Sequence, residues 1–284
     1  MSGPNASKAE RPGARRLLGP QDAAPFTVRR RPLGRHLGRP TLVVCDHASN
    51  AVPLALAALG LPAEARARHI AWDPGAGALA EALAERLRLT LVRSGFSRLV
   101  IDCNRPLQHA GSILAVSDGQ GVPGNTGLSA NEREQRVAEI FVPYHAAIEL
   151  ELLRLATSVA APALIAVHSF TPKLNSTDRP WHCGVLWDRD PRIPVPLIAA
   201  LRGEPGVLVG DNEPYSGKDP SNYTINTHAE ARGWAHVCLE VRQDLLADAA
   251  GVALWSERLA LALEPILDDA SLYSPSLYSE REPA

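Results

Sequence analysis

Two histidines follow short apolar runs, at the points where buried strands would end. His47 comes just after the run Thr41–Cys45, and His168 directly follows Leu164–Val167. Apolar runs of this length, rich in β-branched residues, are typical of buried strands. Open α/β sheets bind their ligands at the carboxyl ends of the strands, and neutral imidazole is a common ligand of zinc. We therefore predict that both histidines bind a divalent metal ion, with zinc as the first choice.

A catalytic zinc site typically has a third protein ligand and one position left for water. Asn50 lies three residues after His47, where a His-x-x-Glu motif has its carboxylate, but asparagine is a poor zinc ligand. Asp73 offers a carboxylate, although Pro74 behind it also favours Asp73 as the N-cap of a helix. Asp73 is the preferred third ligand, and Asn50 stays open as the alternative.

Three arginines and an asparagine could bind an anionic substrate. Asn104 and Arg105 follow the apolar run Leu99–Ile101, Arg98 directly precedes it, and Arg242 closes a later predicted strand. A guanidinium binds a carboxylate through two parallel, charge-assisted hydrogen bonds. We therefore expect these four residues to bind the carboxylates of an amino-acid-like small molecule.

Glu240 is the candidate general base. It leaves the predicted strand that contains Val237–Leu239, and on its own it could equally form an ion pair. A metal-dependent hydrolase needs a carboxylate beside the metal to take a proton from water. Glu240 is the best-placed carboxylate without another assigned role. A serine nucleophile is not favoured, since Ser169 lacks the Gly-x-Ser-x-Gly motif.

Together these motifs resemble the N-formylglutamate amidohydrolase family over about residues 40–265. The segments that carry the resemblance are, in order, Asp46–Asn50 with Pro53, His69–Asp73, Arg98 with Asp102 and Asn104–Arg105, Leu128–Ser129 with Glu132–Arg133, Pro143–His145, His168–Ser169, Asp211–Tyr215 and Glu240–Arg242.

The resemblance implies a zinc-dependent hydrolase with a fold similar to zinc carboxypeptidases and aspartoacylases. In those enzymes a His-x-x-Glu motif and a later histidine bind zinc, an Asn-Arg pair binds the substrate carboxylate, and a late glutamate is the general base. His47, His168, Asn104–Arg105 and Glu240 match these roles, whereas Asn50 replaces the glutamate ligand. The implied reaction is hydrolysis of an N-acyl amino acid, first of all N-formyl-L-glutamate to formate and L-glutamate, the last step of one route of histidine degradation.

Two other functions remain open. The chain could be a carboxypeptidase-like peptidase or amidase for another acylated amine. It could also be a small-molecule-binding protein without catalysis, in which Asn50 marks a degraded metal site.

The elements that must position these residues alternate between strand and helix. Strands are predicted at 41–45, 89–92, 99–101, 164–167, 183–187, 207–209 and around 240, and the main helices at 75–87, 129–156, 196–202 and 251–263. This alternation predicts one α/β domain at 40–270, with a mostly parallel, mixed sheet and helices on both faces. The long loops 106–128 and 210–224 are expected to shape the pocket.

Charge and composition limit the partners. Residues 1–39 carry a net charge of +7 and are predicted to form a flexible basic leader, while the remaining residues carry −9. Nothing in the mildly acidic body indicates a nucleic-acid surface, and no run has the ~20 apolar residues of a membrane span. The four cysteines are far apart and suit a reducing, cytoplasmic compartment. Residues 271–284 are predicted to form a C-terminal tail, and the sequence does not predict the oligomeric state.

Overall fold

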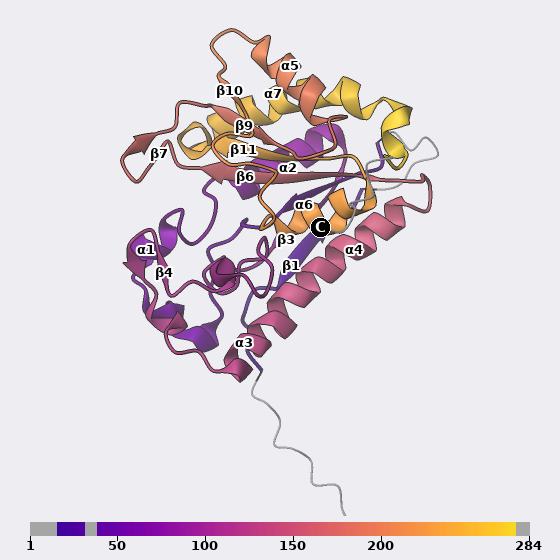
Figure 1. Ribbon diagram of the computed structural model, residues 1–284. Helices are drawn as coiled ribbons and strands as arrows, with labels where there is room; N and C mark the ends of the chain where they lie inside the picture. Colours follow the sequence, from indigo (N-terminus) through magenta and orange to yellow (C-terminus); the bar gives the residue numbers. More distant parts are fainter. Residues whose placement is uncertain (1–15, 32–38, 277–284) are drawn as a thin grey trace, which may run out of the picture.

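A seven-stranded sheet forms the centre of the computed structural model, which describes residues 16–31 and 39–276. The strand order is β1-β3-β2-β6-β11-β9-β10 (Figure 1). The strands are β1 (Phe26–Arg29), β2 (Thr41–Cys45), β3 (Thr90–Ser94), β6 (Ala163–Phe170), β9 (Cys183–Leu186), β10 (Val209–Asp211) and β11 (His236–Arg242). The four central strands β3, β2, β6 and β11 are parallel, whereas β1 and β9 run antiparallel to their neighbours β3 and β11. This confirms the predicted mostly parallel, mixed sheet.

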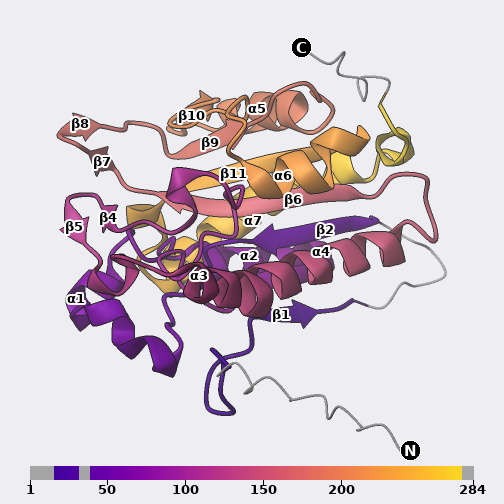
Figure 2. The ribbon, with the colours of Figure 1, turned by 60° about the horizontal axis from the view of Figure 1, so that its bottom comes forward.

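Helices cover both faces of the sheet (Figures 1 and 2). One face packs against α2 (Ala76–Leu87), α5 (Pro194–Arg202) and α7 (Ala249–Leu267), and the other against α4 (Val142–Leu155) and α6 (Tyr223–His228). Strand β2 contributes to both cores, because successive side chains point to opposite faces: Val43 lies in the first core and Val44 in the second. Double-sided burial explains why β2 and β6 are almost continuously apolar in the sequence.

The predicted helix at 129–156 is confirmed as one continuous stretch. It begins at the capping box of Ser129 and Glu132, in which each side chain bonds the other's backbone N–H. The helix comprises α3 (Ala130–Arg136), a π-helical turn (Val137–Phe141) and α4. Smaller elements are α1 (Ala63–Ala67) and the hairpins β4 (Val116–Ser117) with β5 (Gln120–Gly121) and β7 (Lys173–Leu174) with β8 (Thr177–Asp178).

The strand predicted at Leu99–Ile101 is wrong, since these residues form a buried turn. The backbone bends back on itself, and the Val100 N–H donates to the carbonyl of Ser97. Side chains replace a neighbouring strand as hydrogen-bond partners: Asn125 donates to the Leu99 carbonyl and Arg136 to the Val100 carbonyl, at 2.8 and 2.9 Å. The run is therefore apolar because it is buried.

The expected flexible leader is also wrong where the structure describes it. Residues 26–29 form the edge strand β1, antiparallel to β3. Leu17 is buried, and the backbone N–H groups of Leu17 and Leu18 donate to the Glu139 carboxylate. The basic composition concealed the alternation of half-buried and exposed residues that makes an edge strand. Residues 1–15 and 32–38 lie outside the described part.

The first residues of the predicted C-terminal tail, 271–284, are packed against the domain. Leu272 and Tyr273 belong to a 3₁₀ turn (Ala270–Tyr273) and are buried against the first core. Residues 277–284 lie outside the described part. All four cysteines are buried and free. Within 16–31 and 39–276, none of the helices is both long enough and apolar enough to cross a membrane.

Candidate active site

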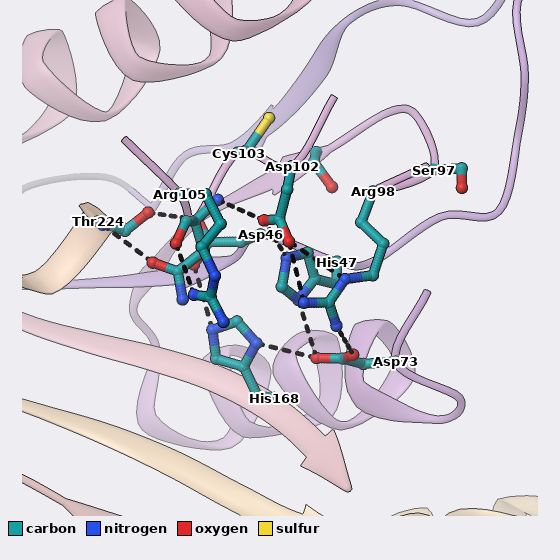
Figure 3. A network of polar contacts seen from close by, with 12 residues as sticks. Asp46, His47, Asp73, Ser97, Arg98, Asp102, Cys103, Arg105, His168 and Thr224 are labelled. Atoms are coloured by element: carbon teal, nitrogen blue, oxygen red, sulfur yellow. Dashed lines mark hydrogen bonds and ion pairs between the residues drawn. The ribbon is translucent and has the colours of Figure 1, made fainter. Parts of the chain in front are cut away.

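His47, His168 and Asp73 meet at the carboxyl ends of β2 and β6 (Figure 3). The Nδ1 atoms of His47 and His168 lie 3.2 and 2.8 Å from Oδ2 of Asp73. All three side chains are buried, and one potential ligand atom from each lies within 4.8 Å of the others. The preferred set of metal-binding residues thus forms one cluster.

Asp73 turns toward the histidines and does not cap a helix. The N-cap of α2 is Gly75, whose φ of 80° lies in the left-handed region, and no side chain caps it. The N-cap expectation for Asp73 is therefore wrong. The alternative ligand Asn50 lies elsewhere: its amide donates to the carbonyl of Arg66 at 3.1 Å, and it does not line the pocket described below.

A second carboxylate holds the far nitrogen of each imidazole. Nε2 of His47 lies 2.7 Å from Asp102, and Nε2 of His168 lies 3.2 Å from Asp46. Metal-binding histidines commonly donate their second ring N–H to a carboxylate, which fixes the tautomer and orients the ring. Because Asp102 and Asp46 bind the Nε2 atoms, the Nδ1 atoms of His47 and His168 face the Asp73 carboxylate. These two nitrogens and the carboxylate oxygens of Asp73 are donors that fit a metal ion.

The two outer carboxylates are anchored from different elements. Tyr144 on α4 and Thr224 on α6 donate hydroxyl hydrogen bonds to Oδ1 of Asp46, at 2.8 and 2.7 Å. Asp102 accepts from the Arg98 guanidinium at 2.9 Å and from the backbone N–H of Asn104 at 2.8 Å. The sequence interpretation assigned no role to Tyr144 or Thr224, because nothing in their local sequence indicates which distant carboxylate they reach.

Charge also favours a cation at this position. Four carboxylates, those of Asp46, Asp73, Asp102 and Glu240, are buried here, against two guanidinium groups in the lining of the adjoining pocket, those of Arg98 and Arg105. Burial opposes their ionisation, but the neighbouring histidines, among other groups, hold the pKa of Asp46 at about 2 and that of Asp102 well below its usual value.

The pKa values of the two histidines shift upward, in the direction opposite to those of Asp46 and Asp102. Burial disfavours their charged forms, yet the surrounding carboxylates raise the pKa of both His47 and His168 above the ordinary value. The carboxylates around the site therefore favour positive charge at the two imidazoles. A divalent cation in place of the two protons would satisfy the same carboxylates.

A pocket of about 120 Å³ opens beside the three residues. Arg98, Asn104, Arg105 and Glu240 line it together with His47, Asp73 and His168. Arg98 also binds Oδ1 of Asp73, at 3.3 Å, so its guanidinium bridges the candidate ligand Asp73 and the outer carboxylate Asp102 and orients both.

Arg242 is not brought to this pocket. Its guanidinium bonds the carboxylate of Asp244 at 2.8 Å and the carbonyl of Pro180 at 3.2 Å, and it is absent from the described lining. The expectation that Arg242 binds substrate is not supported by this placement.

Asn104 and Arg105 present polar groups to the pocket from the turn that follows Asp102. Oδ1 of Asn104 accepts from the backbone N–H of Thr224 at 3.0 Å, which orients the amide. Nη1 of Arg105 donates to the carbonyls of Asn104 and Ser221, at 2.9 and 3.3 Å. These contacts fix one edge of the guanidinium, and the other nitrogens make no further hydrogen bond within the described residues.

Glu240 lines the same pocket from β11. It is in register with His168 on β6, so the two side chains share one face at the sheet edge. Burial raises the pKa of Glu240 to about 7, and the charge of Asp73 acts in the same direction. Its Oε2 atom has no hydrogen-bond partner within the described residues. Glu240 can therefore exchange a proton near neutral pH.

The two long loops differ in their contribution. Tyr215, Ser216, Asp219 and Asn222 from loop 210–224 line the pocket, whereas the lining includes no residue of loop 106–128. The side chain of Asn212 accepts from the backbone of Trp187 and of Gly217, at 3.0 and 2.8 Å, and holds loop 210–224 against β9. The first loop instead contributes Asn125, which supports the turn before Asp102.

Fold and site together define an α/β protein with a buried candidate metal centre at the edge of a mostly parallel sheet. The model of the N-formylglutamate amidohydrolase family matches residues 39–247. The chain therefore belongs to this family, which confirms the resemblance seen in the sequence.

Two solved structures are similar to this chain. A gene product of Agrobacterium tumefaciens is 32% identical, with a TM-score of 0.80, and the match covers 88% of this chain and 99% of that one. The N-formylglutamate amidohydrolase of Ralstonia eutropha JMP134 is 23% identical, with a TM-score of 0.63, covering 87% and 98% of the two chains. The second likeness shows the fold alone. No curated protein matches.

Proposed function

We propose that this protein is a metal-dependent amidohydrolase that cleaves the amide of an N-acyl amino acid. N-formyl-L-glutamate, with formate and L-glutamate as products, is the first candidate substrate. The observation that carries the proposal is the common pocket shared by the His47–Asp73–His168 cluster, Arg105 and Glu240. Family membership supports hydrolysis of a linear amide.

His47, His168 and Asp73 would hold the metal, with zinc as the first choice because two imidazoles and a carboxylate suit it. When bound, a divalent metal supplies Lewis acidity that polarises the amide carbonyl and acidifies water. Asp46 and Asp102 keep the two imidazole rings in place through their outer nitrogens. Arg98 holds the carboxylates of Asp73 and Asp102 in a fixed relative position.

Arg105 binds the substrate carboxylate, and the Asn104 amide assists. This contact positions the amide carbon between the metal position and Glu240. Glu240 takes a proton from the attacking water as the new C–O bond forms. It then gives that proton to the amine nitrogen as the C–N bond breaks, which releases the amino acid.

The test combines metal analysis with a formate-release assay on N-formyl-L-glutamate. The wild type should contain one metal ion per chain and release formate. His47→Ala should lose both the metal and the activity, whereas His109→Ala, an exposed histidine outside the described pocket lining, should keep both. Cleavage of peptides alone would favour a peptidase, and no hydrolysis after zinc addition would favour a binding protein.

A further inference from the structure

A closed ring of hydrogen bonds surrounds the candidate metal position, and each residue of this hydrogen-bond ring contacts the next at 2.7 to 3.2 Å. In order, its members are His47, Asp102, Asn104, Thr224, Asp46, His168 and Asp73, which contacts His47 again. All of them are buried. The ring therefore contains the candidate metal ligands, both outer carboxylates and a residue proposed to bind substrate, and Thr224 is its remaining member.

Thr224 closes the hydrogen-bond ring with two different groups. Its backbone N–H donates to Oδ1 of Asn104 at 3.0 Å, and its hydroxyl donates to Oδ1 of Asp46 at 2.7 Å (Figure 3). Thr224 is 0% exposed and lies in the first turn of α6, so solvent does not compete for either bond. Thr224 thus joins the outer carboxylate of His168 to the amide of Asn104.

The start of α6 also fixes the backbone of the turn that carries Asn104 and Arg105. The backbone N–H of Tyr223 donates to the Asn104 carbonyl at 3.3 Å, and Nη1 of Arg105 donates to the same carbonyl at 2.9 Å. The position of α6 therefore affects both groups that are proposed to bind the substrate carboxylate.

Tyr144 provides a comparison within the same site. Its hydroxyl donates to the same Oδ1 atom of Asp46, at 2.8 Å, but it does so from α4. Within the described residues, Tyr144 makes no hydrogen bond to Asn104. Both hydroxyl groups hold Asp46 behind His168, whereas Thr224 in addition holds Asn104.

We propose that Thr224 is a positioning residue that couples the metal position to the substrate carboxylate, so that each ligand strengthens the binding of the other. The proposal rests on the proposed roles of His168 and of Asn104 with Arg105. His168, once it holds a metal ion, fixes Asp46, and Asp46 in turn fixes Thr224 and thereby Asn104. The first ligand to bind orders these shared side chains, so the second binds at a lower cost in entropy. Such coupling is reciprocal.

The test compares the calorimetric Kd of L-glutamate for the zinc-free and the zinc-loaded protein. In the wild type, zinc should lower this Kd by at least about 10-fold. Thr224→Val keeps the shape of the side chain but removes the hydroxyl, and it should reduce the ratio of the two Kd values by about 3-fold or more. Thr224→Ser keeps the hydroxyl and should retain the wild-type ratio. Direct attraction between zinc and the carboxylate acts in every variant, so the differences among variants report the hydrogen-bond ring.

Tyr144→Phe separates the coupling from a general weakening of the metal site. Competition with a chelator should show that it lowers zinc affinity by about 10-fold, while its ratio of L-glutamate Kd values stays at the wild-type value. Thr227→Val makes the same change as Thr224→Val at a partly exposed position of α6 and should match the wild type in both measurements.

Kinetics on the zinc-loaded protein provide a further readout, since Thr224→Val should raise KM for N-formyl-L-glutamate and Thr224→Ser should restore it. Hydrolysis of no N-acyl amino acid would overturn the proposed function, and the binding ratios would still decide the role of Thr224. Equal affinity of zinc-free and zinc-loaded wild type for L-glutamate, a wild-type ratio in folded Thr224→Val, or an equal loss of the ratio in Tyr144→Phe would overturn the coupling.

Discussion

The residue that most directly tests the chemistry is Glu240. Glu240→Gln keeps the size and shape of the side chain but cannot accept a proton, so kcat should fall by about 10²- to 10⁴-fold. Steady-state formate release measures the loss, while metal content and unfolding temperature should stay at wild-type values. Glu257→Gln, on the exposed surface of α7, is the matched control. Full activity in Glu240→Gln would exclude the general-base role.

Arg105 and Arg242, two of the three arginines that the sequence predicted to bind substrate, should behave differently. Arg105→Ala should lower kcat/KM for N-formyl-L-glutamate by at least about 30-fold, corresponding to the ~2 kcal/mol lost when one partner of a charge pair is removed. Arg242→Ala should have little effect, because Arg242 pairs with Asp244 outside the pocket. Kinetics on an N-formyl amine without a carboxylate provide the control, since this substrate should not respond to Arg105→Ala. A larger effect at Arg242 would contradict the assigned placement.

At the scale of elements, the turn that carries Asp102, Asn104 and Arg105 depends on one buried arginine. Arg136 on α3 donates to the carbonyls of Val100 and Gly124 and to Oδ1 of Asn125, at 2.9, 3.0 and 2.6 Å. Its side chain is 1% exposed, and burial lowers its pKa to about 10. The turn is therefore held in place by polar side chains, and β pairing plays no part in it.

Arg136→Met should lower the free energy of unfolding by about 3 kcal/mol or more, because several buried acceptors lose their donor. Activity should fall as well, since the same turn carries pocket residues. Urea denaturation measures the stability. Arg133→Met, on the exposed side of the same helix, should stay within about 0.5 kcal/mol of the wild type. Equal stability of the two variants would show that the turn does not depend on Arg136.

The sequence predicted regular elements better than it predicted this turn. In the run Thr41–Cys45 and on the buried face of α2, the spacing of the apolar residues alone indicates which side chains are buried. Local patterns were therefore sufficient to predict these elements. Leu99–Ile101 has the same apolar composition, but its hydrogen-bond partners come from Asn125 and Arg136. Partners that distant leave no periodic signal, and the run was mistaken for a strand.

At the scale of the whole molecule, a buried pair of histidines should make stability depend on pH. His145 on α4 donates from Nε2 to the carbonyl of Cys103, at 2.8 Å, and its Nδ1 lies 3.0 Å from Nε2 of His228 on α6. Burial, followed by the charge of His228, lowers the pKa of His145 to about 4. In the unfolded chain the pKa of histidine is about 6.5.

Between pH 6.5 and 4 the unfolded state therefore binds the additional proton, and stability falls as the pH falls. The full effect of this shift is about 3 kcal/mol. Metal-free His145→Gln should show a shallower decline over this range than metal-free wild type, as measured by denaturation at each pH. The exposed His109→Gln should follow the wild type, and parallel curves for all three proteins would contradict the assignment.

The sequence by itself determined the central strands of the sheet, the main helices of both layers and the residue types of the site. Short stretches of sequence contain the patterns for burial on two faces, for helical periodicity and for polar residues after apolar runs. The order of the motifs along the chain indicated the family. Only the tertiary structure decided which of these residues meet. In the folded chain Asp73 contacts both histidines, and Asp46 and Asp102 contact the outer nitrogens of the imidazoles. Asn50 and Arg242 do not line the pocket. Contacts between residues 26 to 178 positions apart depend on the packing of separate elements, and no local spacing contains that information.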